Sequence, residues 1–344
     1  MSDAPIEPAA KGTPDAPQPP DEFLVSAAPH LADRQTTRKI MYLVVIAMLP
    51  MLLAAGVFYR YHAIVLTVVT VAACLATEAV ANAIRGRKQD SLSDGSAIVT
   101  GMILAFSLPP AMNPYMAVIG GVVAIGLAKA VFGGLGQNLF NPAMVGRAFL
   151  MACFPAAMSI WTEPGTLAQI GGIDVVTRAT PLEAASNPAE SVPSLYDLFI
   201  GNVGGCLGET SALAALVGGL FLVFRRVADW RPVVGVLGSA FVFALIAHAV
   251  NPEKFEGPLF HLTSGAMMFG AFFIATDYVG APITPWGRLI FGIGVGVLVM
   301  IIRLFGKYPE GFMFAILIMN ALTPLIERWT IPTPFGGHVV TQRK

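Results

Sequence analysis

The chain has 344 residues, of which 55% are hydrophobic and only 12% are charged, and its mean hydropathy is +0.69. Soluble domains usually carry about 25% charged residues, so this composition indicates a protein that lies in a lipid bilayer. The 21 basic and 21 acidic residues cancel, which leaves no basic surplus for binding nucleic acid. The three cysteines, Cys74, Cys153 and Cys206, stand far apart. We therefore expect no metal site and no disulfide framework, and we interpret the cysteines as packing residues.

Residues 1–33 begin with a stretch rich in Pro, Asp and Ala, which predicts a disordered cytoplasmic tail without a secretory signal. Ten apolar stretches follow, and a hydrocarbon core of about 30 Å needs roughly 20 such residues per helix. The predicted class is an all-α membrane protein with about ten transmembrane helices. The stretches lie near residues 40–58, 63–83, 96–110, 115–133, 143–161, 209–225, 232–250, 263–281, 286–304 and 310–327.

The distribution of Lys and Arg predicts the orientation of these helices. With the N-terminus in the cytoplasm, fourteen of the 21 basic residues fall in inner segments and five in outer segments. Cytoplasmic loops normally carry the excess of basic residues, which favours this orientation. Both termini, including the tail 331–344, are then cytoplasmic, and the loop 162–208 faces outward.

An internal repeat is indicated by pairs of residues about 168 to 170 positions apart, among them Ser96 with Ser264, Pro155 with Pro324 and Trp161 with Trp329. The first five helices, within residues 34–161, would then repeat as the second five, within residues 209–330. Because five is odd, the halves would insert with opposite orientation. This inverted five-plus-five repeat is typical of transporters, whose sites gather at the repeat interface.

Four ionisable residues, Glu78, Lys129, Arg147 and Asp277, lie inside predicted spans, where a charge costs roughly 2.5–3.5 kcal/mol. Glu78 could bind a cation or relay a proton, or it could be a hydrogen-bonded packing residue. Asp277 precedes two prolines, so we expect the helix to break there and to expose backbone groups that a ligand could use.

Two glycine-containing stretches mark further candidates. In GGLGQNLFNPAMVGRAFL the chain breaks at Asn141-Pro142, and Arg147 follows one to two turns later. A broken helix presents N–H groups and a positive dipole end, which suits an anionic or polar aromatic ligand. Alternatively, this is a sharp turn with Arg147 anchored to headgroups. In GNVGGCLGETSA, Glu209 opens the sixth span, where it could serve an ion path or only complement the helix dipole.

The polar loop contains DVVTRATPLE, in which Thr177 and Thr180 flank Arg178. Taken alone, the threonines could cap a helix begun by PLEAAS, with Pro181 in its first turn. No GxSxG, HExxH or Walker pattern occurs in the chain, which argues against hydrolysis and the use of ATP.

Six motifs occur in order: VSAAPH, GQNLFNPAMVGRAFL, DVVTRATPL, GNVGGCLGETSAL, FFIATDYVGAPITPWGRLIFG and YPEGFMFAILIMNALTPLIE. Over about residues 24–335 the chain resembles the RnfD subunit of the Rnf complex, an ion-translocating oxidoreductase. It is also similar to the related NqrB subunit of sodium-pumping NADH:quinone oxidoreductase. The resemblance implies a bacterial inner-membrane complex that exchanges electrons between ferredoxin and NAD and couples this exchange to Na⁺ or H⁺ movement.

In that family a loop of the form Asp-x-x-Ser/Thr-Gly-Ala-Thr carries FMN on its last threonine, through a phosphoester bond made by a flavin transferase. Asp174, Thr177, Ala179 and Thr180 match this pattern, so the resemblance implies covalent FMN on Thr180 in an outward, periplasmic loop. Arg178 stands where the family has Gly, and an arginine there could pair with the phosphate.

The resemblance further implies an electron-carrying subunit that catalyses nothing complete alone and whose partners are the other subunits of the complex. We expect Glu78, Glu209 and Asp277 to be ion-path candidates. Asn141 and Arg147 are expected contacts of a second, non-covalent flavin, riboflavin or FMN.

Three other functions remain open at this point. The chain could be an NqrB-like protein that passes electrons to quinone, a urea-channel-like transporter without a redox role, or a structural anchor for a soluble reductase. The sequence leaves open which ion moves, the direction of electron flow, the flavin potential and the effect of Arg178 on flavin loading.

Overall fold

The structure is a computed structural model that describes residues 36–86, 89–162, 164, 179–186, 192–306 and 310–332. Helices account for most of these residues, which confirms the predicted helical class. The α-helices are α1 (Thr37–Tyr59), α2 (Tyr61–Ile84), α3 (Ser96–Phe106), α4 (Pro114–Val122), α5 (Pro142–Cys153), α6 (Pro155–Met158), α7 (Pro181–Ser186), α8 (Leu195–Ile200), α9 (Ala212–Phe224), α10 (Trp230–Val250), α11 (Pro258–Thr263), α12 (Met267–Phe269), α13 (Pro285–Phe305) and α14 (Phe312–Thr330).

Two π-helical segments continue short α-helices: η2 (Val123–Ala130) extends α4, and η5 (Gly270–Ile274) extends α12. Two 3₁₀ segments, η1 (Gln89–Asp94) and η4 (Leu207–Glu209), precede α3 and α9. π-helical turns occur frequently at functional sites, and both of these π-helical segments border the cavity described below.

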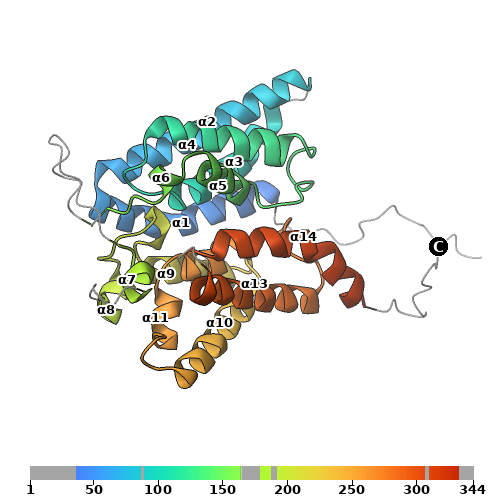
Figure 1. Ribbon diagram of the computed structural model, residues 1–344. Helices are drawn as coiled ribbons and strands as arrows, with labels where there is room; N and C mark the ends of the chain where they lie inside the picture. The colour runs from blue at the N-terminus through green and yellow to red at the C-terminus, as the bar shows by residue number, and fades with distance from the viewer. Residues whose placement is uncertain are drawn as a thin grey trace, which may run out of the picture. The chain divides into compact units, whose positions relative to one another are not determined.

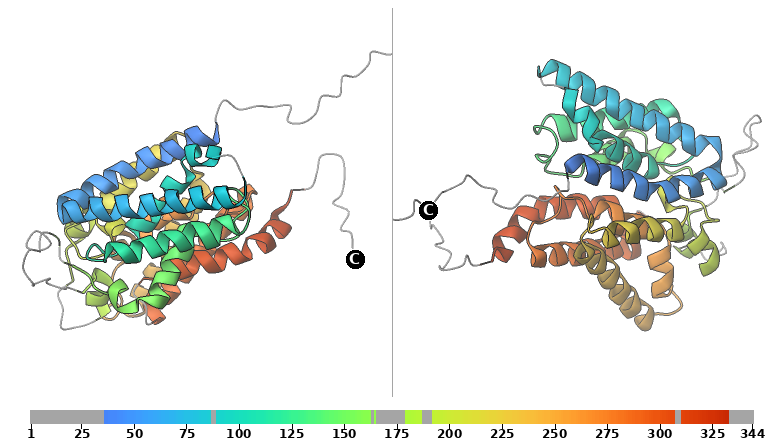
Figure 2. Two further views of the ribbon diagram at one scale, coloured as in Figure 1. Left: turned by 90° about the horizontal axis from the view of Figure 1, so that it is seen from above. Right: turned by 180° about the vertical axis from the view of Figure 1, so that it is seen from behind.

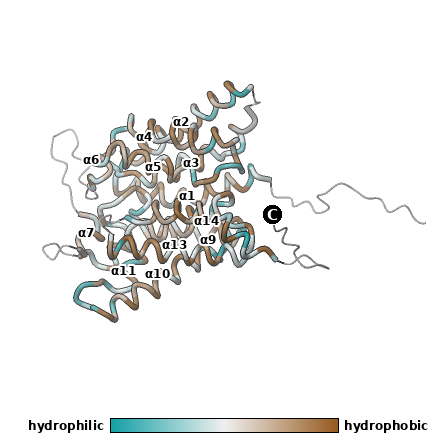
Figure 3. Tube along the Cα trace, turned by 45° about the vertical axis from the view of Figure 1, so that its right-hand side comes forward, coloured by the Kyte–Doolittle hydropathy of each residue, from teal (hydrophilic) through white to brown (hydrophobic). Residues whose placement is uncertain are grey.

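Five helices, α1, α2, α10, α13 and α14, are long and apolar enough to cross a membrane. Shorter helices lie within the other five predicted stretches. That all ten segments cross the membrane, that they form an inverted repeat and that both termini are cytoplasmic stay predictions. Figure 3 shows apolar residues along the helices and hydrophilic residues in connections such as that between α10 and α11.

Three helix ends differ from the predicted spans for local reasons. The span 96–110 ends at Phe106, because the Ser107 hydroxyl bonds the Leu104 carbonyl and two prolines follow. The span 143–161 divides at Pro155, which lacks the N–H that a continuous helix needs. Glu209 lies in η4, before the first turn of α9, so the expectation that it opens that helix is wrong.

The sequence specifies several helix starts through capping side chains. The Asn141 side chain accepts a hydrogen bond from the Met144 N–H, and Pro142 occupies the first turn of α5. Thr284 caps α13 in the same way, again followed by proline. Such caps satisfy N–H groups that have no partner inside the helix. These caps determine where α5 and α13 begin, and polar side chains lie together at such helix ends.

The described helices form two groups (Figure 1). Helices α1 to α6, drawn in blue to green, lie on one side, and helices α7 to α14, drawn in yellow-green to red, lie on the other. The view from behind in Figure 2 shows the same division. Helices α1 and α5 of the first group pack against α9 and α14 of the second. Residues along this seam can therefore be contributed by both predicted halves.

Glycines allow the closest helix contacts. A Cβ atom on Gly218 of α9 would lie 2.0 Å from the Ala47 carbonyl oxygen of α1, and one on Gly292 of α13 would lie 2.4 Å from the Pro232 carbonyl oxygen of α10. Small residues at such crossings let membrane helices approach backbone to backbone, where dispersion replaces the hydrophobic effect as the attraction. Close packing therefore joins α1 to α9 and α10 to α13.

We predict that Gly292→Ala destabilises the folded chain by about 1–3 kcal/mol, because its methyl group would force α13 away from α10. The matched control is Gly238→Ala on α10, where an added Cβ meets no atom within 4 Å. Thermal denaturation of the purified variants in detergent measures the difference. Equal melting temperatures for the two variants would contradict the described contact.

Candidate functional site

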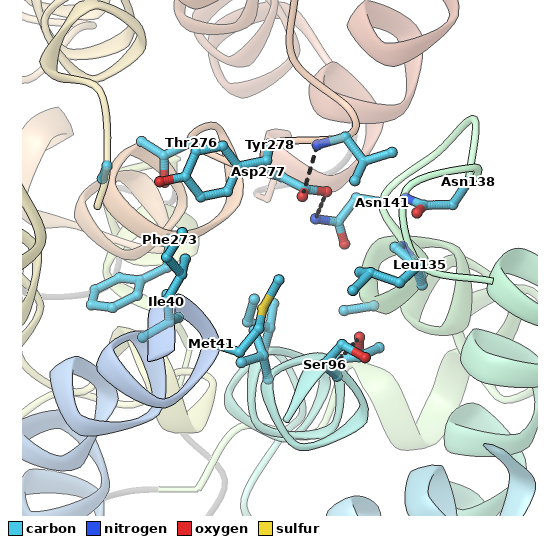
Figure 4. A pocket seen from close by; sticks show the side chains of 18 of the residues that line it. Ile40, Met41, Ser96, Leu135, Asn138, Asn141, Phe273, Thr276, Asp277 and Tyr278 are labelled. Carbon is cyan, nitrogen blue, oxygen red and sulfur yellow. Dashed lines mark hydrogen bonds between the residues drawn. The ribbon is translucent and has the colours of Figure 1, made fainter. Parts of the chain in front are cut away.

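A cavity lies between the two helix groups, and its walls come from both. It contains about 820 Å³ of space that no protein atom occupies, part of it open to the exterior. Its apolar wall includes Ile40 and Met41 of α1, Leu135, and Phe273 of η5 (Figure 4). An apolar cavity with a few convergent polar groups is the usual form of a site for a small molecule or cofactor.

The polar part of this wall is built around Asn141 and Asp277, the two helix-break residues that the sequence singled out. The Asn141 Nδ2 donates to Asp277 Oδ2 at 3.2 Å, as Figure 4 shows. The Val279 N–H donates to Asp277 Oδ1 at 3.3 Å, and the Asn141 N–H donates to Asn320 Oδ1 of α14 at 3.1 Å. The expected break at Asp277 is confirmed, since η5 ends at Ile274. The hydrogen bonds at this break connect Asn141 of the first helix group to Asp277 and Asn320 of the second.

Arg147 does not line this cavity, although it lies only six residues beyond Asn141. Its Nη2 atom is 3.4 Å from Glu310 Oε2 and 3.5 Å from Cys206 Sγ, and its side chain is 4% exposed. The interpretation of Arg147 as an anchor to lipid headgroups is therefore wrong, because the guanidinium is buried. Its expected contact with a second flavin stays a prediction.

Glu209 and Arg303 complete a buried charge cluster around Arg147 and Glu310. Glu209 Oε2 accepts from the Cys206 N–H at 3.4 Å, and the Sγ atom of the same cysteine lies near Arg147. Glu310 Oε1 also accepts from the Ala266 N–H at 3.0 Å. Arg303 donates to the carbonyl oxygens of His261 at 2.8 Å and Ser264 at 3.1 Å. Two arginines and two acidic side chains thus share one buried polar network, and this pairing lowers the free-energy cost of burying them.

Glu78 forms a second buried ion pair, separate from that cluster. The Lys129 ammonium of η2 lies 2.8 Å from Glu78 Oε1 of α2 and donates to the Ser96 hydroxyl at 2.6 Å. The side chains of Lys129 and Glu78 are only 3% and 7% exposed. The alternative of a hydrogen-bonded packing residue therefore describes the contact of Glu78 correctly. The ion pair does not test whether Glu78 also has a role in an ion path.

Thr180 immediately precedes α7 and is itself 3% exposed. Its hydroxyl accepts from the Glu183 N–H at 3.2 Å, and the Glu183 carboxylate accepts from the Thr180 N–H at 3.1 Å. This reciprocal capping confirms that Thr180 caps the helix of PLEAAS, with Pro181 in its first turn. Ala179 precedes it, whereas Asp174, Thr177 and Arg178 lie outside the described residues.

Helix α7 packs beside the buried charge cluster. Leu182 of α7 forms a small apolar cluster with Leu198, Val203 and Phe260. A Cβ atom on Gly265 would lie 3.0 Å from Leu182 Cδ1 and 2.5 Å from Glu310 Oε1. One glycine thus separates the Thr180 helix from a charged side chain of the cluster.

Two titratable groups near helix ends have shifted pKa values. Burial lowers the pKa of His261 to about 4, and the neighbouring Arg303 acts in the same direction, so this ring is neutral at pH 7. Burial alone would raise the pKa of Asp229. The backbone N–H of Arg231 and the guanidinium groups of Arg288 and Arg231 outweigh it and keep that pKa below its ordinary value. Asp229 thereby ties the start of α10 to α13.

Sequence reasoning missed Glu310 and Asn320, and it assigned no partner to Lys129. Glu310 stands only at the predicted start of the tenth helix, and Asn320 is a single amide in a long apolar run. A polar residue within an apolar run was the available signal. Its partner could not be read from the sequence, because the partner lies more than 40 positions away in each case.

We predict that Arg147→Met destabilises the chain by about 3–5 kcal/mol, since it leaves the Glu310 carboxylate buried without its guanidinium. The double variant Arg147→Met/Glu310→Gln removes the uncompensated charge and should recover a large part of this loss. Thermal denaturation of the purified variants measures both effects. A double variant that is no more stable than the single one would contradict the ion pair.

Known proteins are similar to this chain over nearly its whole length. The sequence model of the NQR2, RnfD, RnfE family matches residues 24–336. The chain is 44% identical to the D subunit of the Na⁺-translocating ferredoxin:NAD⁺ oxidoreductase complex of Acetobacterium woodii, over 91% of the chain and 95% of that relative.

Two further relatives are similar over comparable lengths. The D subunit of the proton-translocating ferredoxin:NAD⁺ oxidoreductase complex of Clostridium ljungdahlii is 38% identical, over 91% of the chain and 96% of that protein. The D subunit of the ion-translocating oxidoreductase complex of Aeromonas hydrophila is 37% identical, over 92% of the chain and 99% of that protein. The chain therefore belongs to the NQR2, RnfD, RnfE family.

Proposed function

We propose that this chain is a membrane subunit of an Rnf-type ferredoxin:NAD oxidoreductase complex and that it carries electrons through FMN esterified to Thr180. The observation that carries the proposal is the match of Asp174, Thr177, Ala179 and Thr180 to the flavin-attachment pattern, in a chain that belongs to this family over nearly its whole length. The names of the relatives favour ferredoxin and NAD over quinone as the electron partners.

One hydrogen bond of Thr180 is compatible with such an ester. Its Oγ1 serves as an acceptor for the Glu183 N–H, and a phosphoester replaces the hydroxyl proton without removing the oxygen. The capping bond can therefore survive attachment. Because Thr180 is 3% exposed, α7 has to leave its position against Leu198 and Phe260 before a flavin transferase can reach the hydroxyl. When bound, FMN supplies one- and two-electron transfer at a fixed place.

A second, non-covalent flavin, riboflavin or FMN, is proposed to bind at the central cavity. Asn138 and Asn141 offer amide groups, Asp277 offers a carboxylate, and Phe273 and Leu135 offer apolar surface. A flavin ring has apolar faces and one edge of carbonyl and N–H groups, so it needs both kinds of wall. In this proposal Asn141 orients the ring edge. Arg147, which belongs to the buried charge cluster, stays a candidate contact of the same flavin.

Ion translocation is proposed to involve the three acids Glu78, Glu209 and Asp277, of which the first two are buried. Each has a different setting: Asp277 borders the central cavity, Glu209 belongs to the charge cluster, and Glu78 is paired with Lys129. Buried acids in membrane helices commonly mark ion pathways. In this proposal Asp277 is the one of the three acids that also borders the flavin site.

The proposed setting is the bacterial inner membrane, with ten spans as two inverted five-helix halves, both termini in the cytoplasm and the flavin loop outside. One structural parallel supports the repeat. Lys129 donates to the Ser96 hydroxyl at the start of α3, and Arg303 donates to the Ser264 backbone carbonyl ahead of α12. Ser96 and Ser264 are paired positions of the proposed repeat. The other Rnf subunits and a flavin transferase are the proposed partners.

We predict that Thr180→Val, which keeps the side-chain shape and removes the hydroxyl, abolishes covalent flavin, whereas Thr180→Ser keeps it. The measurement is ultraviolet fluorescence of the denatured protein band after expression with a flavin transferase. The matched control is Thr263→Val, at a threonine outside the motif, which should stay fluorescent.

Two results would oppose this proposal. A Thr180→Val band as bright as the wild type would move the flavin to another residue. A dark wild-type band, with the transferase shown to be active on another substrate, would mean that Arg178 prevents loading and would favour a transporter without a redox role.

We predict that Val99→Trp, which fills the central cavity from α3, removes non-covalent flavin while leaving the covalent FMN in place. Val99 lines the cavity and Thr180 does not, so the indole ring of the new tryptophan should exclude the ligand without disturbing Thr180. Acid precipitation of the purified protein, followed by fluorescence of the supernatant and of the pellet, separates the two flavins. An unchanged supernatant signal would place the second flavin elsewhere.

A further inference from the structure

The Glu78–Lys129 ion pair separates two cavities. Lys129 and Ser96 line the central cavity, whereas Lys129 and Glu78 line a second cavity together with Asn82, Gly133 and Gly134. The second cavity contains about 670 Å³ of space free of protein atoms, part of it open to the exterior. The Lys129 side chain therefore lies between the proposed flavin site in the central cavity and the second cavity, which is partly open to the exterior.

Only one of the two carboxylate oxygens of Glu78 takes part in this contact. Lys129 is bonded to Oε1, while Oε2 is buried and has no hydrogen-bond partner among the described residues. An unpaired carboxylate oxygen in a low-dielectric site is costly. It indicates a place where a further ligand of the carboxylate can bind.

The surroundings of the Lys129 ammonium are those of a small cation site. Its Nζ atom lies 2.8 Å from Glu78 Oε1 and 2.6 Å from Ser96 Oγ. Hard cations take oxygen ligands of this kind, and one carboxylate balances one positive charge. If the ammonium left, Glu78 and Ser96 would offer an alkali cation three oxygen atoms.

We propose that Lys129 is a tethered cation that occupies an alkali-cation site on Glu78, and that its withdrawal toward the central cavity opens this site to Na⁺. Lys129 is carried by the π-helical segment η2, and its contact with Ser96 already points it to the central cavity. Negative charge in that cavity attracts the ammonium, and the Glu78 carboxylate is then free for a cation arriving through the second cavity. This inference deepens the proposed ion path of Glu78 and rests on it.

The test uses the purified full-length chain without flavin, in lipid nanodiscs, and radiolabelled Na⁺ as the probe. Lys129→Gln leaves Glu78 without its counter-charge, so this variant should bind Na⁺ at least about tenfold more tightly than the wild type. Its melting temperature should rise by about 2–5 °C when NaCl replaces choline chloride at constant ionic strength. Lys129→Arg keeps the charge and should show neither effect.

The double variant Glu78→Gln/Lys129→Gln is the control for the site, because it keeps the mutated Lys129 and removes the carboxylate. It should lose the Na⁺ binding gained by Lys129→Gln. A Lys129→Gln variant that ignores Na⁺ but becomes more stable as the pH falls would show that Glu78 takes up a proton instead, and this would overturn the proposal.

A second variant leaves the ion pair itself intact. Thr100 lies one turn beyond Ser96 on α3, and its hydroxyl bonds the Ser96 carbonyl oxygen. Both residues line the central cavity. Thr100→Asp adds negative charge there and should tighten Na⁺ binding while Glu78 and Lys129 are both present. Unchanged binding would contradict the withdrawal of Lys129. Neither experiment depends on Thr180, so failure of flavin attachment would be recognised separately.

Discussion

A charge inside a protein that lies in hydrocarbon has to be paired, because neither water nor lipid can solvate it there. This constraint explains much of the arrangement around the seam between the two helix groups. Arg147 of the first group meets Glu310 of the second, and Asn141 meets Asp277. Each pair joins residues more than 130 positions apart. Polar pairing thus fixes how the groups meet, while apolar contact alone would tolerate sliding.

Pairing also requires the helices to end inside the fold, since a continuous helix offers no free backbone groups. Prolines and capping residues supply these ends. Asn141 serves both purposes, because its side chain caps α5 with one atom and bonds Asp277 with another. Helix breaks tolerated in membranes are those that line cavities or are buried in protein. The breaks at Asn141 and after η5 meet this condition, since both border the central cavity.

The sequence predicted the helical class, the approximate helices and the helix break at Asp277, because these depend on apolar run length and on nearby proline. It also singled out Asn141, Arg147, Glu78 and Asp277 as unusual. It did not reveal that Glu78 pairs with Lys129 or that Arg147 pairs with Glu310. Those pairings depend on which helix faces which, and glycines such as Gly218 and Gly292 set these faces through contacts that no local pattern encodes. Some helix ends were predicted wrongly for a related reason. Hydropathy alone extends a helix to the end of the apolar run, whereas a side-chain hydrogen bond such as that of Ser107 ends it earlier.

The relatives name different ions: one is Na⁺-translocating and another is proton-translocating, although both are similar to this chain over nearly their whole length. Similarity over nearly the whole chain therefore does not by itself select the ion. Selection has to come from local features that decide whether a buried carboxylate is met by a metal cation, a proton or a fixed side-chain charge. A carboxylate with several oxygen neighbours favours a metal cation, whereas an apolar setting favours protonation. In this chain Glu78 has a hydroxyl and an ammonium beside it, so in the proposed ion path its preference for an ion would depend on where Lys129 lies.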